Sequence, residues 1–156
     1  MDLEEPVDPD VDLHVPAQRR ELAWHHGLIL GVIALGGGLG ALARYGLAQL
    51  WPTHPGRFPW ATFVTNVLGC LLIGVLMVLV TEVWAAHPLV RPFLGVGFLG
   101  GFTTFSTYAV ETRGLLTPGT IGLAFVYVAG TLVAALLATL AGVQATRTLT
   151  RERVST

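Results

Sequence analysis

The chain has 156 residues, of which 53% are hydrophobic and only 12% charged, a composition that excludes an ordinary water-soluble globule and indicates an integral membrane protein. The formal net charge of −1 hides an asymmetry, because acidic residues crowd the first twelve positions while nine arginines supply the positive charge. The single cysteine, Cys70, excludes an internal disulfide and a cysteine-based metal cluster.

The acidic, proline-containing start of the chain does not have the basic region of a cleavable signal peptide. We expect residues 1–23 to form a polar tail in water. Residues 24–146 are predicted to form one membrane domain. Residues 147–156 are predicted to form a second polar tail, in the headgroup region or in water.

Four apolar runs within this domain each approach the ~20 residues that a spanning helix requires. They cover residues 28–50, 60–83, 92–116 and 121–143, and prolines mark the short linkers. The sequence therefore predicts an all-α integral membrane protein with four transmembrane helices.

The first run is rich in glycine, and Gly36 and Gly40 have the four-residue spacing that lets membrane helices approach closely. We interpret this stripe as a packing surface. Arg44, near the end of the run, has two open interpretations. Its side chain extends to the membrane interface, or it stands in a water-filled vestibule and attracts anions.

Asn66 is an amide near the middle of the second run, with Thr62 one turn before it on the same face. A side chain of this kind either forms a hydrogen bond to another helix or lines a pore. The sequence leaves both interpretations open.

The third run contains the stretch that least resembles a simple spanning helix, residues 97–111 (GFLGGFTTFSTYAVE). Gly100 and Gly101 weaken a helix, and the hydroxyl groups that follow need partners that lipid tails do not offer. These hydroxyls belong to Thr103, Thr104, Ser106, Thr107 and Tyr108. We therefore predict a broken third helix at the functional centre, whose freed carbonyls can hold a cation. Glu111 is interpreted as a residue near the membrane interface.

In the fourth run Tyr127, Thr131 and Ala135 share one face, beside a ridge of small residues from Gly130 to Gly142. The ridge predicts packing. Tyr127 and Thr131 fit either hydrogen bonds between helices or the rungs of a polar track, and both interpretations stay open.

The polar groups in the middle of the runs are uncharged. No acidic residue lies in the middle third of any run, which argues against a proton-coupled pump or a cation-driven exporter. No catalytic motif indicates an enzyme. Amide and hydroxyl groups donate hydrogen bonds, and aromatic edges carry partial positive charge, so these residues fit a pathway for a small anion.

Three motifs resemble those of the CrcB/Fluc fluoride channels: GGLGALARY (residues 37–45), ATFVTNVLGC (residues 61–70) and the stretch at residues 97–111. The resemblance covers the chain from about residue 28 to residue 143. It implies a passive, fluoride-specific channel that reduces fluoride toxicity. It also implies a multi-pass protein of the cell inner (cytoplasmic) membrane, built as an antiparallel dimer of the dual-topology type.

The resemblance also implies roles for single residues. A structural sodium ion, which is not transported, is implied at the dimer centre, on main-chain carbonyls at Gly100 and Thr103. The implied fluoride pore contains Asn66, Phe105, Thr107, Tyr108, Tyr127 and Thr131, and Arg44 matches the vestibule arginine. Two positions depart from the family: Tyr108 stands in place of a second pore phenylalanine, and Ala135 in place of a common serine.

The arginines are divided unevenly between the two sides of the predicted domain, with six on the side of both termini and two on the other. This bias predicts that the termini lie inside the cell, whereas a protein that inserts both ways should show almost no bias. We therefore keep the hypothesis that this subunit prefers one orientation and pairs with an oppositely oriented paralogue, with a homodimer as the alternative.

Two other classes remain as alternatives. A small four-helix multidrug-type exporter is also an antiparallel dimer, but the first run lacks the midplane glutamate expected for it. A non-transporting assembly protein would explain the glycine spacing, although not Asn66 or the hydroxyl-rich stretch. Nothing in the sequence indicates a nucleic-acid partner.

Overall fold

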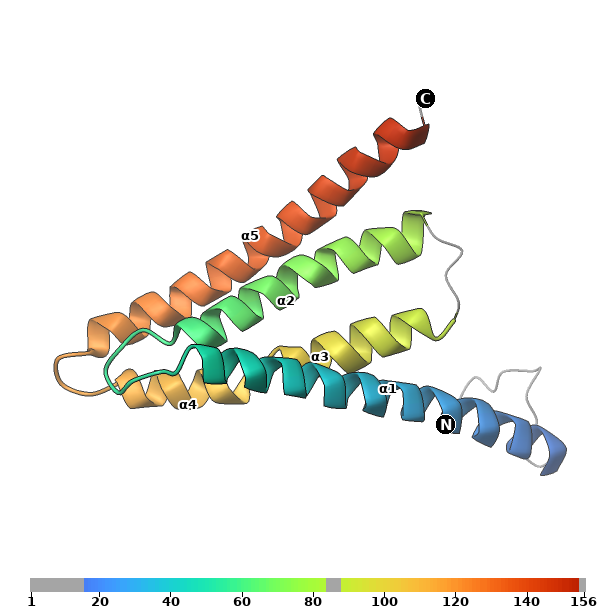
Figure 1. Ribbon diagram of the computed structural model, residues 1–156, viewed down its shortest axis with the longest axis horizontal. Coiled ribbons are helices and arrows are strands. Elements are labelled where there is room, and N and C mark those ends of the chain that lie inside the picture. The colour runs from blue at the N-terminus through green and yellow to red at the C-terminus, as the bar shows by residue number, and fades with distance from the viewer. Residues whose placement is uncertain (1–15, 84–87, 155–156) are drawn as a thin grey trace, which may run out of the picture.

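The computed structural model describes the backbone of residues 16–83 and 88–154, and the side chains of residues 27–83 and 88–150. All regular structure in this part of the chain is helical (Figure 1). Its elements are α1 (Pro16–Leu50), α2 (Trp60–Val78), η1 (Leu79–Val83), η2 (Arg91–Leu99), α3 (Gly100–Phe102), α4 (Ser106–Leu115) and α5 (Ile121–Val154), of which η1 and η2 are π-helical.

Four helical segments are long and apolar enough to cross a membrane. They are Gly27–Leu50, Trp60–Val83, Arg91–Leu115 and Ile121–Thr150, which confirms the predicted all-helical protein with four spans. The helices extend beyond the apolar runs. α1 begins at Pro16, inside the predicted N-terminal tail, and α5 continues to Val154, through most of the predicted C-terminal tail. Alanine, glutamine, arginine and glutamate favour helix, so these polar extensions continue it.

The helices form two pairs, α1 with η2 and α3, and α2 with α5. Figure 1 shows that the pairs diverge away from the end that carries the α1–α2 and α4–α5 loops. A small core at the loop end joins α4 to α5 and contains Leu115, Ala124 and Tyr127. Side chains in the more open middle of the bundle are therefore available to line a cavity.

Glycine allows the close contact within each pair. A Cβ atom at Gly40 would collide with the carbonyl oxygen of Phe98 in η2, and one at Gly36 would also meet the η2 backbone. The predicted packing role of this stripe is therefore confirmed. On α5, Gly142 lies equally close to the α2 backbone, whereas Gly130 has no neighbour within 4 Å.

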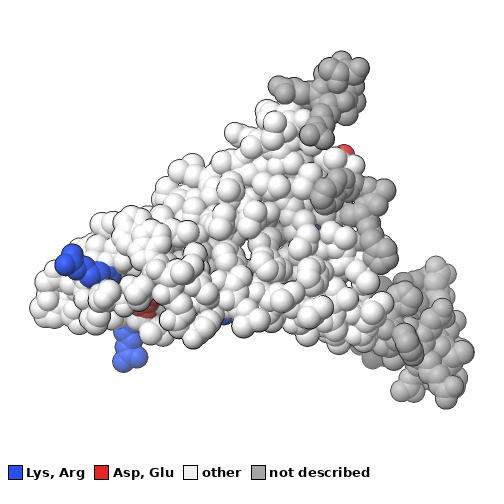
Figure 2. Space-filling view, in the orientation of Figure 1, with Lys and Arg blue, Asp and Glu red and all other residues white. Residues whose placement is uncertain are grey.

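The outward surface along the helices is mostly apolar. On α5, Leu132, Leu136 and Leu140 are each more than half exposed. Figure 2 shows an uncharged surface along most of the molecule, with arginine side chains standing out at the loop end. Apolar side chains on this scale are stable against lipid or against another membrane protein, so the chain is a multi-pass membrane protein.

In the third span, α3 ends at Phe102 and α4 begins at Ser106. The backbone of Thr103 between them is extended, with ψ at 159°. The Thr104 hydroxyl accepts a hydrogen bond from the backbone N–H of Thr107 at 3.2 Å, which satisfies one of the free amides in the first turn of α4.

Candidate functional site

Asn66 of α2 holds the segment between α3 and α4. Its Nδ2 donates to the carbonyl oxygen of Thr104 at 3.0 Å, and the backbone N–H of Thr104 donates to Oδ1 of Asn66 at 2.9 Å. A carboxamide in this orientation satisfies both main-chain groups of a residue that has left the helix. The sequence left open whether Asn66 forms hydrogen bonds to another part of the bundle or lines a pore. In the structure it forms such hydrogen bonds and also lines a cavity.

Arg44 of α1 contacts the end of α3. Its Nε donates to the carbonyl oxygen of Gly101 at 3.1 Å, and its side chain is half-buried. Because α3 ends at Phe102, the carbonyl of Gly101 has no backbone N–H of a following helical turn to accept from, and Arg44 supplies a donor instead. Arg44 therefore binds the main chain at the end of α3.

The carbonyl oxygens of Gly100 and Thr103 accept no hydrogen bond from any residue that the structure describes. Gly100 is also exposed on the surface of the single chain. The described residues contain no group of three His, Cys, Asp or Glu side chains that could hold a metal. A cation at this point would be held by main-chain oxygens, which suit a hard ion such as sodium.

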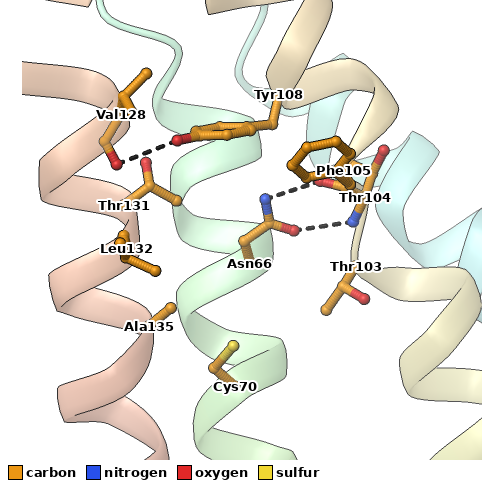
Figure 3. Close-up of a pocket in the computed structure, with 10 residues that line it drawn as sticks. All are labelled: Asn66, Cys70, Thr103, Thr104, Phe105, Tyr108, Val128, Thr131, Leu132 and Ala135. Atoms are coloured by element: carbon orange, nitrogen blue, oxygen red, sulfur yellow. Dashed lines mark hydrogen bonds between the residues drawn. The ribbon is translucent and has the colours of Figure 1, made fainter. Parts of the chain in front are cut away.

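A cavity of 630 Å³ opens between α2, α5 and the segment that joins α3 to α4 (Figure 3). Its lining residues are Asn66, Cys70, Thr103, Thr104, Phe105, Tyr108, Val128, Thr131, Leu132 and Ala135. The polar groups in this wall are all uncharged: an amide, hydroxyls and one thiol. Such groups can replace part of the hydration of a small anion without binding it as tightly as a fixed positive charge would.

The hydroxyl of Thr131 is the unusual group in this wall. The other threonines of α5 whose side chains are described donate to the carbonyl four residues earlier, as Thr139 does to Ala135 at 3.0 Å. Oγ1 of Thr131 is buried and has no hydrogen-bond partner in the described part of the chain. Because a buried hydroxyl without a partner is costly, we expect it to bind water or an ion in the cavity.

The two tyrosines of the site have different surroundings. Tyr108 lines the cavity, and its hydroxyl donates to the carbonyl oxygen of Val128 at 3.1 Å (Figure 3). Tyr127 is fully buried at 0% exposure, with its ring centroid 5.0 Å from that of Tyr108. It does not line the cavity, so of the two predicted track residues only Thr131 does so.

The sequence did not indicate the contacts of Glu111, which lies beside the cavity residues rather than among them. Its Oε1 accepts a hydrogen bond from the Thr62 hydroxyl at 3.0 Å, and its Oε2 accepts one from the Tyr127 hydroxyl at 2.8 Å. Glu111 is half-buried and joins α2, α4 and α5, and its interpretation as a residue near the membrane interface does not include these contacts. One feature of the sequence could have indicated these contacts. Glu111 lies one helical turn after the hydroxyl-rich stretch, and the second and fourth runs carry hydroxyl groups from which a carboxylate can accept hydrogen bonds.

The structure brings together five of the residues predicted for the site. The cavity wall contains Asn66, Thr103, Phe105, Tyr108 and Thr131, and four others do not line it, namely Arg44, Gly100, Thr107 and Tyr127. Thr107 accepts a hydrogen bond from the Thr104 hydroxyl at 3.1 Å. Ala135 also lines the wall, and it leaves the cavity with one hydroxyl fewer than a serine would.

Comparison with known proteins gives consistent matches. Residues 31–143 match the family described as CrcB-like protein, Camphor Resistance (CrcB). A Nocardia farcinica protein named fluoride-specific ion channel FluC 2 is 61% identical over 119 residues, which cover 76% of this chain and 85% of that protein. A Streptomyces avermitilis protein of the same name is 55% identical over 126 residues, which cover 80% and 79%.

Proposed function

Because the chain belongs to the CrcB family, we propose that it is a fluoride-specific ion channel that lets fluoride leave the cell passively and so reduces its toxicity. The observation that carries this function is a cavity whose polar groups are all uncharged and whose wall contains Thr131, with its buried and unpartnered hydroxyl. The names of the similar proteins favour a channel over a small multidrug-type exporter.

Fluoride is the smallest halide and holds its hydration water most tightly, so a selective path must supply close hydrogen-bond donors. The Thr131 hydroxyl is free to donate, and Asn66 Nδ2 has a second N–H beyond the one given to Thr104. The rings of Phe105 and Tyr108 stand in the same wall and can present their positive edges. These four residues form the proposed fluoride path. A larger anion would fit less well between the hydrogen-bond donors of this path.

The break between α3 and α4 is proposed to bind a structural sodium ion that is not transported. This proposal is supported by the unpaired carbonyls of Gly100 and Thr103, which are oxygen ligands of the right kind, and by the exposure of Gly100, which leaves room for ligands from a second subunit. Sodium bound there would replace the hydrogen bonds that the interrupted helix has lost.

The functional unit is proposed to be an antiparallel dimer. The ring of Phe105 is 80% exposed in the single chain although it lines the cavity, which suits a ring that a second subunit covers. The second subunit is another copy or an oppositely oriented paralogue, and the arginine bias of the sequence favours the paralogue. The proposed location is the cell inner (cytoplasmic) membrane.

Efflux from proteoliposomes tests the proposed function. Vesicles loaded with fluoride should release it rapidly once a potassium ionophore removes the opposing voltage, and vesicles loaded with chloride should release almost none. Neither a proton gradient nor an added drug should alter the rate. Equal release of the two halides, or release that depends on a proton gradient, would contradict the proposal.

A further inference from the structure

A second cavity, of 360 Å³, lies at the loop end of the bundle, where the α1–α2 loop passes over the end of α4. Its wall includes His54 and Arg57 from the loop, and Glu111 and Gly114 from α4. Figure 2 shows arginine side chains standing out at this end of an otherwise uncharged surface. Charged side chains of both signs, Arg57 and Glu111, therefore line this cavity.

A hydrogen bond and a ring contact link the wall of this outer cavity to the wall of the central one. Glu111 lines the outer cavity and accepts the Tyr127 hydroxyl at 2.8 Å. The Tyr127 ring contacts the ring of Tyr108, which lines the central cavity, at a centroid distance of 5.0 Å. Glu111 is thus a carboxylate of the outer cavity that contacts, through Tyr127, a residue in the wall of the central cavity.

The charge of Glu111 poses a problem for an anion path. Among the described side chains no arginine forms an ion pair with it, since its recorded partners are the hydroxyls of Thr62 and Tyr127. A carboxylate repels an approaching anion unless a positive charge in the same hollow offsets it. Arg57 is the arginine in the wall of the outer cavity.

We propose that the outer cavity is a binding site for small monovalent anions, at which Arg57 concentrates the conducted ion beside Glu111. This inference rests on the proposed fluoride conduction and adds the residue that supplies ions to the path. His54 lines the same wall and offers a ring N–H as a further donor.

The attraction of anions by Arg57 should depend strongly on the salt concentration. A single charge a few ångströms from a water-filled site raises the local anion concentration about threefold at low ionic strength. The screening length falls from about 30 Å at 10 mM to about 3 Å at 1 M, so concentrated salt removes most of this attraction.

The test compares Arg57→Gln with Arg113→Gln in vesicles of zwitterionic phosphatidylcholine, at 10 mM and at 1 M of an impermeant salt. Arg113 is exposed and lies on α4 near the same end, but it does not line the cavity. We expect Arg57→Gln to slow fluoride release about threefold at 10 mM and to match the wild type at 1 M. Arg113→Gln should match the wild type in both, and Arg57→Lys should keep the wild-type rate.

Equal rates for Arg57→Gln and Arg113→Gln at 10 mM would overturn the inference. A defect of Arg57→Gln that persists at 1 M salt would overturn it as well, because screening does not repair a structural change. In both cases the wild-type protein would still conduct fluoride, and the proposed function would stand. A wild-type protein that releases no fluoride at either salt concentration would instead overturn the proposed function, and this inference with it.

Discussion

Replacing Thr131 with valine is the sharpest test of the central cavity. Valine has nearly the shape of threonine and lacks only the hydroxyl, so the change removes one hydrogen-bonding group with little loss of volume. Thr131 lines the cavity, and its hydroxyl is buried and has no hydrogen-bond partner in the described part of the chain. Its removal should act on the conducted ion and leave the packing of α5 intact.

The expected magnitude follows from the energy of a hydrogen bond to a charged group, about 1.5–3 kcal/mol. If the ion loses this bond at the narrowest point of its path, conduction slows about 10- to 100-fold, since each ~1.4 kcal/mol is a factor of ten. The stability of the folded protein, in contrast to its conduction, should not fall. A buried hydroxyl without a partner costs about 1–3 kcal/mol, so the variant should be at least as stable as the wild type.

Fluoride efflux and thermal unfolding in detergent measure the two effects separately. Thr139→Val is the matched control, because the Thr139 hydroxyl donates to Ala135 within its own helix and does not line the cavity. The control should conduct at close to the wild-type rate. Wild-type flux in Thr131→Val would show that the hydroxyl does not contact the ion, and the assignment of this wall to the fluoride path would fail.

Three further substitutions separate conduction from folding. Asn66→Ala should abolish flux and also lower the melting temperature, because both main-chain groups of Thr104 lose their partners at about 1–3 kcal/mol each. An unchanged melting temperature would show that the two hydrogen bonds between Asn66 and Thr104 do not stabilise the fold. Gly40→Ala should prevent stable assembly, seen as aggregation on size-exclusion chromatography, whereas Gly38→Ala, with no neighbour within 4 Å, should be tolerated. Phe105→Ala should reduce flux without unfolding the single chain, since the ring is 80% exposed, and a large loss of folded protein would show a structural role instead.

Local sequence determined most of the architecture. Hydropathy is a property of neighbouring residues, so four apolar runs sufficed to predict four spans, and the helices extended past them because their polar flanks also favour helix. The spacing of Gly36 and Gly40 likewise predicted a close contact without identifying its partner, η2. The resemblance of three motifs to a known family predicted five of the residues that line the cavity.

Only the tertiary structure decided how the site is held together, because its contacts join residues far apart in the chain. Asn66 and Thr104 are 38 positions apart, Thr62 and Glu111 are 49 apart, and Arg44 and Gly101 are 57 apart. No periodicity within one helix encodes such pairs. The sequence therefore did not show that the carboxylate of Glu111 accepts hydrogen bonds from two hydroxyls, or that Tyr127 is buried in the core at the loop end. Packing between helices determines which of these polar groups meet.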